Sequence, residues 1–246
     1  MLRGFARGGA RSWVSGVFFC LYLNCLENYI RNDSMRIATT FLLMLCLVAT
    51  AAAESVTIQN ASFEAPAQDP GGWTNDLPEW DGPPAAGDAF IEYIDGFVSE
   101  GVNHIGIQNG QEVSQNLGVS LQANSVYTLT VGVGNRNASF TPTDGSQAST
   151  FGLYAGGDAG DGGTLLAEST VDAGPLGEST FADFSLVYET TDALEAGDLF
   201  VSLRTTGGGR AHYDNIRLEV VPEPTSLTLI GIAGLGLMSL RRRRTK

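Results

Sequence analysis

Cysteine is absent from residues 54–220 of this 246-residue chain, and basic residues are scarce there. Cys20, Cys25 and Cys46 all lie within the first 53 residues, so the body at 54–220 can form no disulfide, zinc–thiolate site or cysteine nucleophile. The body also has no lysine and only four arginines against 24 acidic residues, a net charge of −20. Because phosphate binding requires a basic surface, this charge argues against nucleic acid as a partner.

Histidine is equally scarce, and His104 and His212 are the only two in the chain. Neither has a metal-ligand partner at helical or hairpin spacing, and we expect His212 to be a strand residue near a sheet edge. No Gly-x-Ser-x-Gly nucleophile motif occurs. Carboxylates that could pair for glycoside hydrolysis are Asp76, Glu79, Asp81 and Asp88. Acidic residues are so frequent that such pairs arise anywhere, so we predict a non-catalytic body, with a divergent glycan-active enzyme as the least favoured alternative.

The N-terminal region carries an export signal. Met35-Arg36 precedes an apolar run over residues 37–48, and small residues follow at Ala51 and Ala53. This arrangement predicts a secretory signal peptide over residues 35–53, exported by the Sec machinery and cleaved after Ala53. Residues 1–34 contain a second apolar stretch. We interpret this whole segment as the product of a misassigned start codon, with translation starting at Met35. An additional N-terminal membrane segment is the alternative.

The C-terminal residues 221–246 have three parts. Pro222-Glu223-Pro224 is expected to be extended, because proline fixes its own φ and disfavours helix in the residue before it. Residues 225–240 are apolar and uncharged, and as a helix they would reach about 24 Å. This is short of the usual transmembrane span, so we expect a transmembrane helix that thins the bilayer locally or lets the arginines extend to its surface. The basic end is predicted to be cytoplasmic, and it consists of Arg241, Arg242, Arg243 and Arg244.

This tail resembles the PEP-CTERM sorting signal of Gram-negative bacteria that make extracellular polysaccharide. The resemblance implies a transient inner-membrane anchor that an exosortase recognises and cleaves near Pro222-Glu223-Pro224. The body would then reach the cell surface or the extracellular matrix. An ordinary C-terminal membrane anchor is the alternative.

The body reads as β-structure throughout. Alternation of apolar and polar residues is clearest over residues 126–133, and it recurs around Leu186, Val201 and Leu218. Clusters of glycine and aspartate separate these runs, and no amphipathic helical pattern of ten residues occurs. We therefore expect an all-β fold, a single sandwich of eight to ten strands, with a long ordered loop over residues 65–88.

Four groups of residues follow one another along the body: Asn60-Ala61-Ser62-Phe63-Glu64 with Gly72-Trp73, residues 113–117 with 127–130, residues 181–185, and residues 213–218. In this order they resemble the carbohydrate-binding-module-like jelly rolls of the galactose-binding-like class. The resemblance implies a jelly-roll-type β-sandwich, and it supports the fold better than any ligand.

The same resemblance implies a structural Ca²⁺ held by Glu64 and Asp214. The sequence itself supports this pair, because Asp214 has the strand parity of Ile216 and Leu218 and is expected to face the apolar side. A buried charge without a partner is costly, and carboxylate oxygens are the ligands that calcium prefers. The alternative is that either carboxylate lies at a strand end, solvated or bonded to the backbone.

Trp80 and Tyr93 are candidate carbohydrate-binding residues, because aromatic faces stack on sugar rings. The acidic neighbours of Trp80 suggest that it is exposed, whereas Trp73, in a Gly-Trp pair, is expected in the core. We predict a surface-sorted protein that binds carbohydrate or contributes to extracellular polysaccharide. A structural or adhesive acidic protein without sugar recognition is the alternative.

Overall fold

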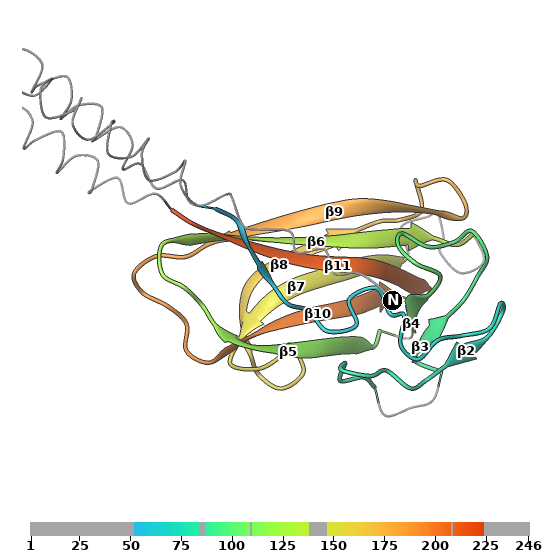
Figure 1. Cartoon of the computed structure of the whole chain (residues 1–246), viewed down its shortest axis with the longest axis horizontal. Coiled ribbons are helices and arrows are strands. Elements are labelled where there is room, and N and C mark those ends of the chain that lie inside the picture. The colour runs from blue at the N-terminus through green and yellow to red at the C-terminus, as the bar shows by residue number, and fades with distance from the viewer. Residues whose placement is uncertain (1–51, 84–86, 109, 138–146, 208, 224–246) are drawn as a thin grey trace, which may run out of the picture. The chain divides into compact units, whose positions relative to one another are not determined.

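The computed structural model describes residues 52–83, 87–108, 110–137, 147–207 and 209–223. All regular elements in these ranges are β-strands, eleven in number (Figure 1). Within the same residues, no helix has the length and apolar character needed to cross a membrane. The segment 1–34, nearly all of the expected signal peptide and the expected membrane segment at 225–240 lie outside the described residues.

Two antiparallel sheets pack face to face. The large sheet runs β2-β3-β4-β11-β6-β9, and β1 pairs with residues 218–220 of β11, beyond the part of β11 that pairs with β4. The small sheet runs β5-β10-β7-β8. The large sheet contains β1 (Glu54–Val56), β2 (Trp73–Thr74), β3 (Ala89–Glu92), β4 (His104–Gln108), β6 (Ser125–Asn135), β9 (Thr180–Glu189) and β11 (Arg210–Pro222). The small sheet contains β5 (Glu112–Ser120), β7 (Gln147–Ala155), β8 (Thr164–Val171) and β10 (Asp198–Gly207).

The predicted all-β sandwich is confirmed. The strand number exceeds the expected eight to ten because β1 and β2 have only three and two residues, too few to show an alternating pattern. The second of these short strands also interrupts the segment that was expected to be one long loop over residues 65–88.

The core lies between the two sheets and follows the alternation in the sequence. Along β6, Tyr127, Leu129, Val131 and Val133 are at most 1% exposed, and burial of each such side chain stabilises the fold by about 1.5–3 kcal/mol. Tyr213 on β11 joins the sheets through its hydroxyl, which lies 3.0 Å from the carbonyl oxygen of Thr150 on β7.

A β-bulge in β11 changes which side chains face the core. The pairing of β11 with β6 shifts register between Asp214 and Arg217, and Asn215 adopts a φ of 50°. As a result, Tyr213 and Ile216 both lie in the core, and Asp214 faces the outer side of the sheet. The prediction from strand parity that Asp214 faces the apolar core is wrong, because parity reverses at a bulge. Asp214 is nevertheless fully buried, since the loop after β3 covers it.

Glycines make room for aromatic rings on the outer face of the large sheet. A Cβ added at Gly106 of β4 would lie 2.7 Å from the ring of Phe90, and one added at Gly134 of β6 would lie 2.6 Å from the ring of Phe181. Both rings therefore approach the sheet more closely than any larger residue would allow.

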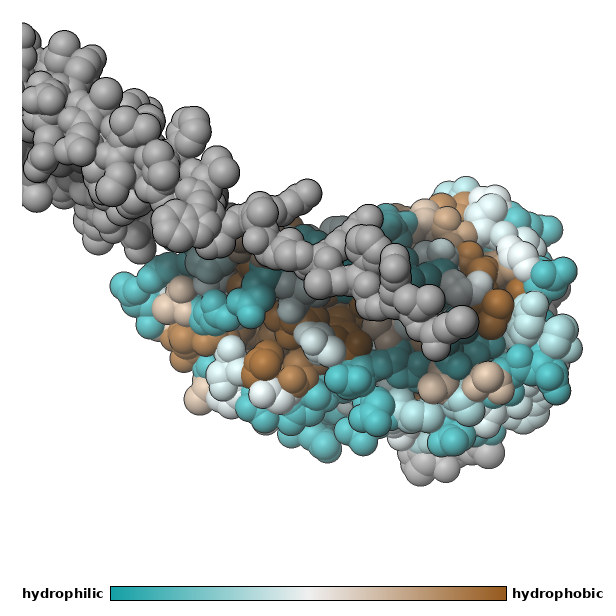
Figure 2. Space-filling view, viewed as in Figure 1, coloured by the Kyte–Doolittle hydropathy of each residue, from teal (hydrophilic) through white to brown (hydrophobic). Residues whose placement is uncertain are grey.

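Hydrophilic residues border the face shown in Figure 2, with a group of apolar residues between them. The largest exposed fraction among the large hydrophobic side chains of the described residues belongs to Trp73, at 62%. It is also the only aromatic side chain in that exposed group of described residues. The ring of Trp73 thus gives this end of the large sheet an apolar surface that is open to solvent.

Candidate functional site on the outer face of the large sheet

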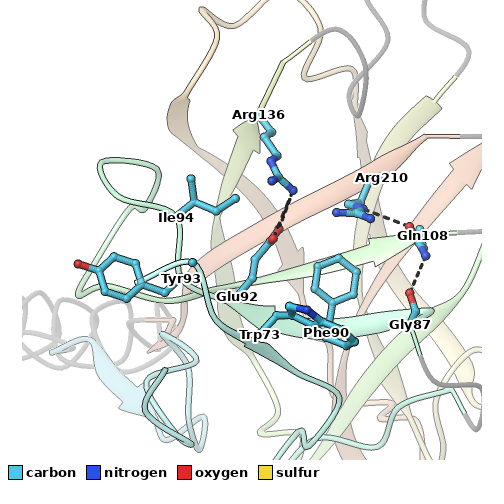
Figure 3. A pocket seen from close by; sticks show the side chains of 10 residues that line it. Trp73, Gly87, Phe90, Glu92, Tyr93, Ile94, Gln108, Arg136 and Arg210 are labelled. Atoms are coloured by element: carbon cyan, nitrogen blue, oxygen red, sulfur yellow. Dashed lines mark hydrogen bonds and ion pairs between the residues drawn. The ribbon is translucent and has the colours of Figure 1, made fainter. Parts of the chain in front are cut away.

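A pocket of about 390 Å³ opens on the outer side of β2, β3, β4 and β11 (Figure 3). Its principal lining side chains are Trp73, Phe90, Glu92, Tyr93, Arg136 and Arg210. Outward alternation on β3 places Phe90 and Glu92 on this side, whereas Ile91 between them is fully buried in the core. The pocket thus combines aromatic surface with charges of both signs.

Aromatic rings and a guanidinium form one wall of the pocket. The ring of Trp73 meets Phe90 edge to face, with centroids 6.3 Å apart, and the guanidinium of Arg210 lies 4.5 Å from the centroid of Phe90. Arg210 Nε donates to Gln108 Oε1 at 3.1 Å, and the amide of Gln108 donates to the carbonyl of Gly87 at 2.6 Å (Figure 3). This network fixes Arg210 in place.

The pocket concentrates the few cations of an acidic body. Two of its four arginines, Arg136 and Arg210, line the pocket, whereas Arg217 pairs with Asp183 elsewhere on the sheet at 2.6 Å. Arg136 Nη1 lies 3.3 Å from Glu92 Oε2. Burial lowers the pKa of Arg210, and nearby Glu92 opposes that change, so the guanidinium remains charged at neutral pH.

Behind the pocket, Glu92 contacts both histidines of the chain. Glu92 Oε1 lies 3.2 Å from His104 Nε2 and 3.6 Å from His212 Nδ1, and both imidazoles are fully buried. Burial lowers the pKa of His212 well below its usual range, and His104, Arg210 and Arg136 lower it further, so this imidazole is neutral. Phe97 covers the group, with its ring centroid 4.8 Å from that of His104 and 5.2 Å from that of His212.

Strand register brings these three residues together. Glu92 pairs directly with His104 across β3 and β4, and His212 pairs with Gly106, two residues further along the same face of β4. The prediction that His212 lies near a sheet edge is wrong, because β11 lies between β4 and β6. The sequence showed no partner for either histidine, because the partners are cross-strand neighbours and not residues at a fixed spacing.

The two carboxylates predicted to bind calcium lie against one loop. Asp214 Oδ2 accepts the N–H groups of Ser99 and Glu100 at 2.7 and 2.8 Å, and Glu64 Oε1 accepts those of Val102 and Asn103 at 2.9 and 3.0 Å. Burial raises the pKa of Asp214 to about 7, against these N–H donors, and the charge of Glu64 raises it further. These two carboxylates supply oxygen atoms of the kind that Ca²⁺ takes as ligands. Calcium at Glu64 and Asp214 stays a prediction.

Comparison of the chain with known protein families and solved structures identifies its family. The model of the HpiC1 cyclase family matches residues 54–219. The chain belongs to the HpiC1-like family. A cyclase from Fischerella sp. TAU is 24% identical, with 70% of this chain and 98% of that chain covered and a TM-score of 0.58. Fisc, a Stig cyclase from the same source solved with (3Z)-3-(1-methyl-2-pyrrolidinylidene)-3H-indole, is 23% identical over 70% and 99% of the chains, also with a TM-score of 0.58.

Two further comparisons concern the sorting signal and carbohydrate-binding modules. The PEP-CTERM protein-sorting motif matches residues 220–244, which confirms the predicted sorting signal at Pro222-Glu223-Pro224 and the arginine cluster. The CBM22-1 xylan-binding domain of Xyn10C from Paenibacillus barcinonensis is 13% identical, covering 70% of this chain and 98% of that chain, with a TM-score of 0.44. No curated protein matches the chain. The predicted non-catalytic body thus belongs to a family named for a cyclase.

In the HpiC1-like domain, the exposure of the two tryptophans is the reverse of what the sequence predicted. Trp80, predicted to be exposed, is only 5% exposed, with its ring centroid 5.4 Å from that of Phe63. Its neighbours Glu79 and Asp81 are exposed although Trp80 is buried, because the segment turns here and Glu79 has a φ of 71°. Acidic flanks therefore do not require an exposed tryptophan. The buried ring leaves no free face for a sugar, which removes Trp80 as a stacking residue. Trp73, predicted to be in the core, is the exposed one.

The other candidates from the sequence divide between the pocket and elsewhere. Tyr93 lines the pocket of the HpiC1-like domain, although its role in carbohydrate binding stays a prediction. None of the four carboxylates considered for glycoside hydrolysis lines this pocket. One of them, Asp81, instead forms a main-chain bridge with Ser114 of β5.

Proposed function

We propose that this protein is a PEP-CTERM surface protein whose HpiC1-like domain binds an acidic carbohydrate in the pocket beside Trp73. The ligand would be a sugar ring that carries a carboxylate, such as a uronic acid unit of an extracellular polysaccharide. Exosortase processing would deliver the domain to the place where such a polymer accumulates.

The observation that carries this proposal is the exposed ring of Trp73 beside two arginines. An exposed indole offers an apolar face on which a sugar ring can stack. Arg136 and Arg210 lie on the same pocket and can pair with a carboxylate through several N–H groups. The pocket therefore offers a stacking surface and an anion-binding group within the reach of one ligand.

The charge of the whole body supports an acidic ligand. At a net charge of −20, the body repels anions in general, so an anionic polymer would bind only where positive charge is concentrated. Half of the arginines in the body line this one pocket. A neutral sugar would form no ion pair with either of these arginines.

Binding to defined oligosaccharides tests the proposal. We expect the full chain to bind oligogalacturonate or another oligouronate in preference to neutral oligosaccharides, as measured by isothermal titration calorimetry. Trp73→Ala should weaken binding at least about tenfold, which corresponds to ~1.4 kcal/mol. Arg210→Gln should weaken binding of the oligouronate, whereas Arg217→Gln, on the same strand outside the pocket, should leave it unchanged. Equal binding by wild type and Trp73→Ala would refute the site.

A second candidate function is catalysis by the same pocket, and membership in the HpiC1-like family favours it. A related cyclase from Fischerella was solved with 4-(1H-indol-3-yl)butan-2-one. Among the residues that the structure describes, Glu92 is the only carboxylate that lines the pocket, so it would be the residue that moves a proton in an acid-promoted cyclisation. Conversion of a small indole substrate by the wild type, lost in Glu92→Gln, would favour this function over carbohydrate binding.

A further inference from the structure

We propose that Glu92, His104 and His212 form a binding site for a divalent transition metal ion, with Zn²⁺ as the first candidate. The site lies behind the pocket and does not depend on which ligand the pocket binds. It is separate from the calcium pair predicted at Glu64 and Asp214.

The spacing of the three side chains suits one metal ion. Glu92 Oε1 is 3.2 Å from His104 Nε2 and 3.6 Å from His212 Nδ1, and one ligand atom from each residue lies within 4.8 Å of the others. Metal–ligand bonds of about 2.0–2.1 Å in a tetrahedron place neighbouring ligand atoms about 3.3–3.4 Å apart. A small closing movement of the two imidazoles is thus enough to surround an ion.

The histidines have nitrogen atoms that lack a partner. His104 Nδ1 and both ring nitrogens of His212 are buried and make no hydrogen bond within the described residues. A buried polar atom without a partner destabilises the folded state, so its presence requires an explanation. A metal bound to His212 Nδ1 would satisfy one of these atoms directly.

Composition makes this arrangement unusual. The 246-residue chain contains only two histidines, and strand register places both against one buried glutamate. A structural role in core packing would not require imidazole twice, since Phe97 and Phe181 already fill this region with phenyl rings. Two histidines and one carboxylate are a common set of three protein ligands for zinc.

The donor set selects the class of metal. Imidazole nitrogen suits zinc, copper, iron and nickel, whereas calcium and magnesium prefer oxygen throughout. Arg136 Nη1 lies 3.3 Å from Glu92 Oε2 and 3.4 Å from Oε1, so it acts as an outer partner that orients the carboxylate. Three protein ligands leave a fourth position, and Glu92 also lines the pocket, so water or a pocket ligand could reach the ion from there.

Metal titration of the full chain, purified without a histidine tag and stripped with chelator, tests the site. We expect one Zn²⁺ per chain by competition with a chromophoric chelator, and visible absorption bands of tetrahedral Co²⁺ when cobalt replaces zinc. Selective ¹⁵N labelling of histidine gives signals from only two residues. Zinc should shift the Nε2 signal of His104 and the Nδ1 signal of His212, which identifies the bound atoms without any mutation.

Variants complete the test. Glu92→Gln and His212→Asn should each abolish stoichiometric zinc binding, whereas Glu219→Gln, an exposed carboxylate on β11, should bind zinc like the wild type. Zinc should raise the unfolding midpoint of the wild type and of Glu219→Gln only. The proposal is overturned if the two ¹⁵N signals do not respond to zinc, or if Glu92→Gln and His212→Asn keep wild-type affinity. Loss of oligouronate binding would not affect any of these results.

Discussion

At the scale of single residues, Asp214 shows how a buried carboxylate depends on its partners. It is fully buried on the outer side of β11, and burial raises its pKa to about 7 although two loop N–H groups and that of Asn215 donate to it. A cation shared with Glu64 would compensate both the burial and the repulsion between the two carboxylates.

We predict that Ca²⁺ stabilises the chain through Glu64 and Asp214. Adding calcium to the metal-stripped chain should raise its unfolding midpoint, because a ligand that binds only the folded state stabilises it, by about 2.7 kcal/mol at a concentration 100 times its Kd. Thermal unfolding followed by circular dichroism measures the effect.

Two variants separate this site from the zinc site. Asp214→Asn should abolish the response to calcium, whereas His212→Asn should retain it, because its imidazole belongs to the other cluster. Identical midpoints for the wild type with and without calcium would eliminate the calcium prediction.

At the scale of secondary-structure elements, the alternation of apolar and polar residues predicted the positions of the strands, but it did not predict which strands pair with one another. The runs at β6 and β10 follow the expected pattern, because each has one face against the core. Pairing between distant strands has no comparable signal, so the contact of Glu92 with His104 and His212 was not foreseen. The bulge at Asn215 was not foreseen either, and it made the predicted direction of the Asp214 side chain wrong. One extra residue in a strand reverses the side to which every later side chain points.

Gly106 on β4 tests how the sheet shapes the pocket. Its missing side chain lets the ring of Phe90 approach the strand, and a Cβ there would lie 2.7 Å from that ring. We predict that Gly106→Ala destabilises the chain by about 1–3 kcal/mol through overpacking and also weakens ligand binding, since Phe90 supports both Trp73 and Arg210. Urea unfolding and calorimetric titration measure the two effects.

A double-mutant cycle identifies the cause. Phe90→Leu removes the atoms that the new methyl group would meet, so Gly106→Ala in the Phe90→Leu background should cost much less than in the wild type. Strictly additive effects of the two substitutions would show that Gly106 is needed for a reason other than the space that Phe90 occupies.

At the scale of the whole molecule, the sequence predicted the class of fold and the sorting signal but not the pocket: of its two candidate carbohydrate-binding residues, Tyr93 lines the pocket and Trp80 is buried. The sandwich follows from local alternation, and the sorting motif is contiguous in the sequence, so both could be read directly. The pocket assembles from four strands and from loops far apart in the chain. Exposure of Trp73 rather than Trp80 depends on that assembly, and local composition favoured the wrong one of the two.

The first two residues of the sorting motif belong to the folded body. Pro222 is the last residue of β11 and pairs with Ser125, and the N–H of Glu223 donates to the carbonyl of Asn124 at 2.7 Å. Both Pro222 and Glu223 are exposed. Pro222 and Glu223 therefore extend the edge of the folded body as paired backbone with exposed side chains.

We predict that the two prolines of the motif are required for processing. Pro222→Ala with Pro224→Ala removes the fixed φ angles and allows helix to form nearer the body, so the extended segment presented to the exosortase is lost. In a polysaccharide-producing host with an exosortase, the variant should remain a membrane-bound precursor, while the wild type yields a shorter form at the surface or in the medium. Immunoblots of membrane, surface and medium fractions measure this.

Pro175→Ala, in an exposed loop of the body, is the matched control and should be processed normally. Equal processing of the double variant, or an unchanged wild-type distribution in a host without exosortase, would show that the motif does not direct sorting.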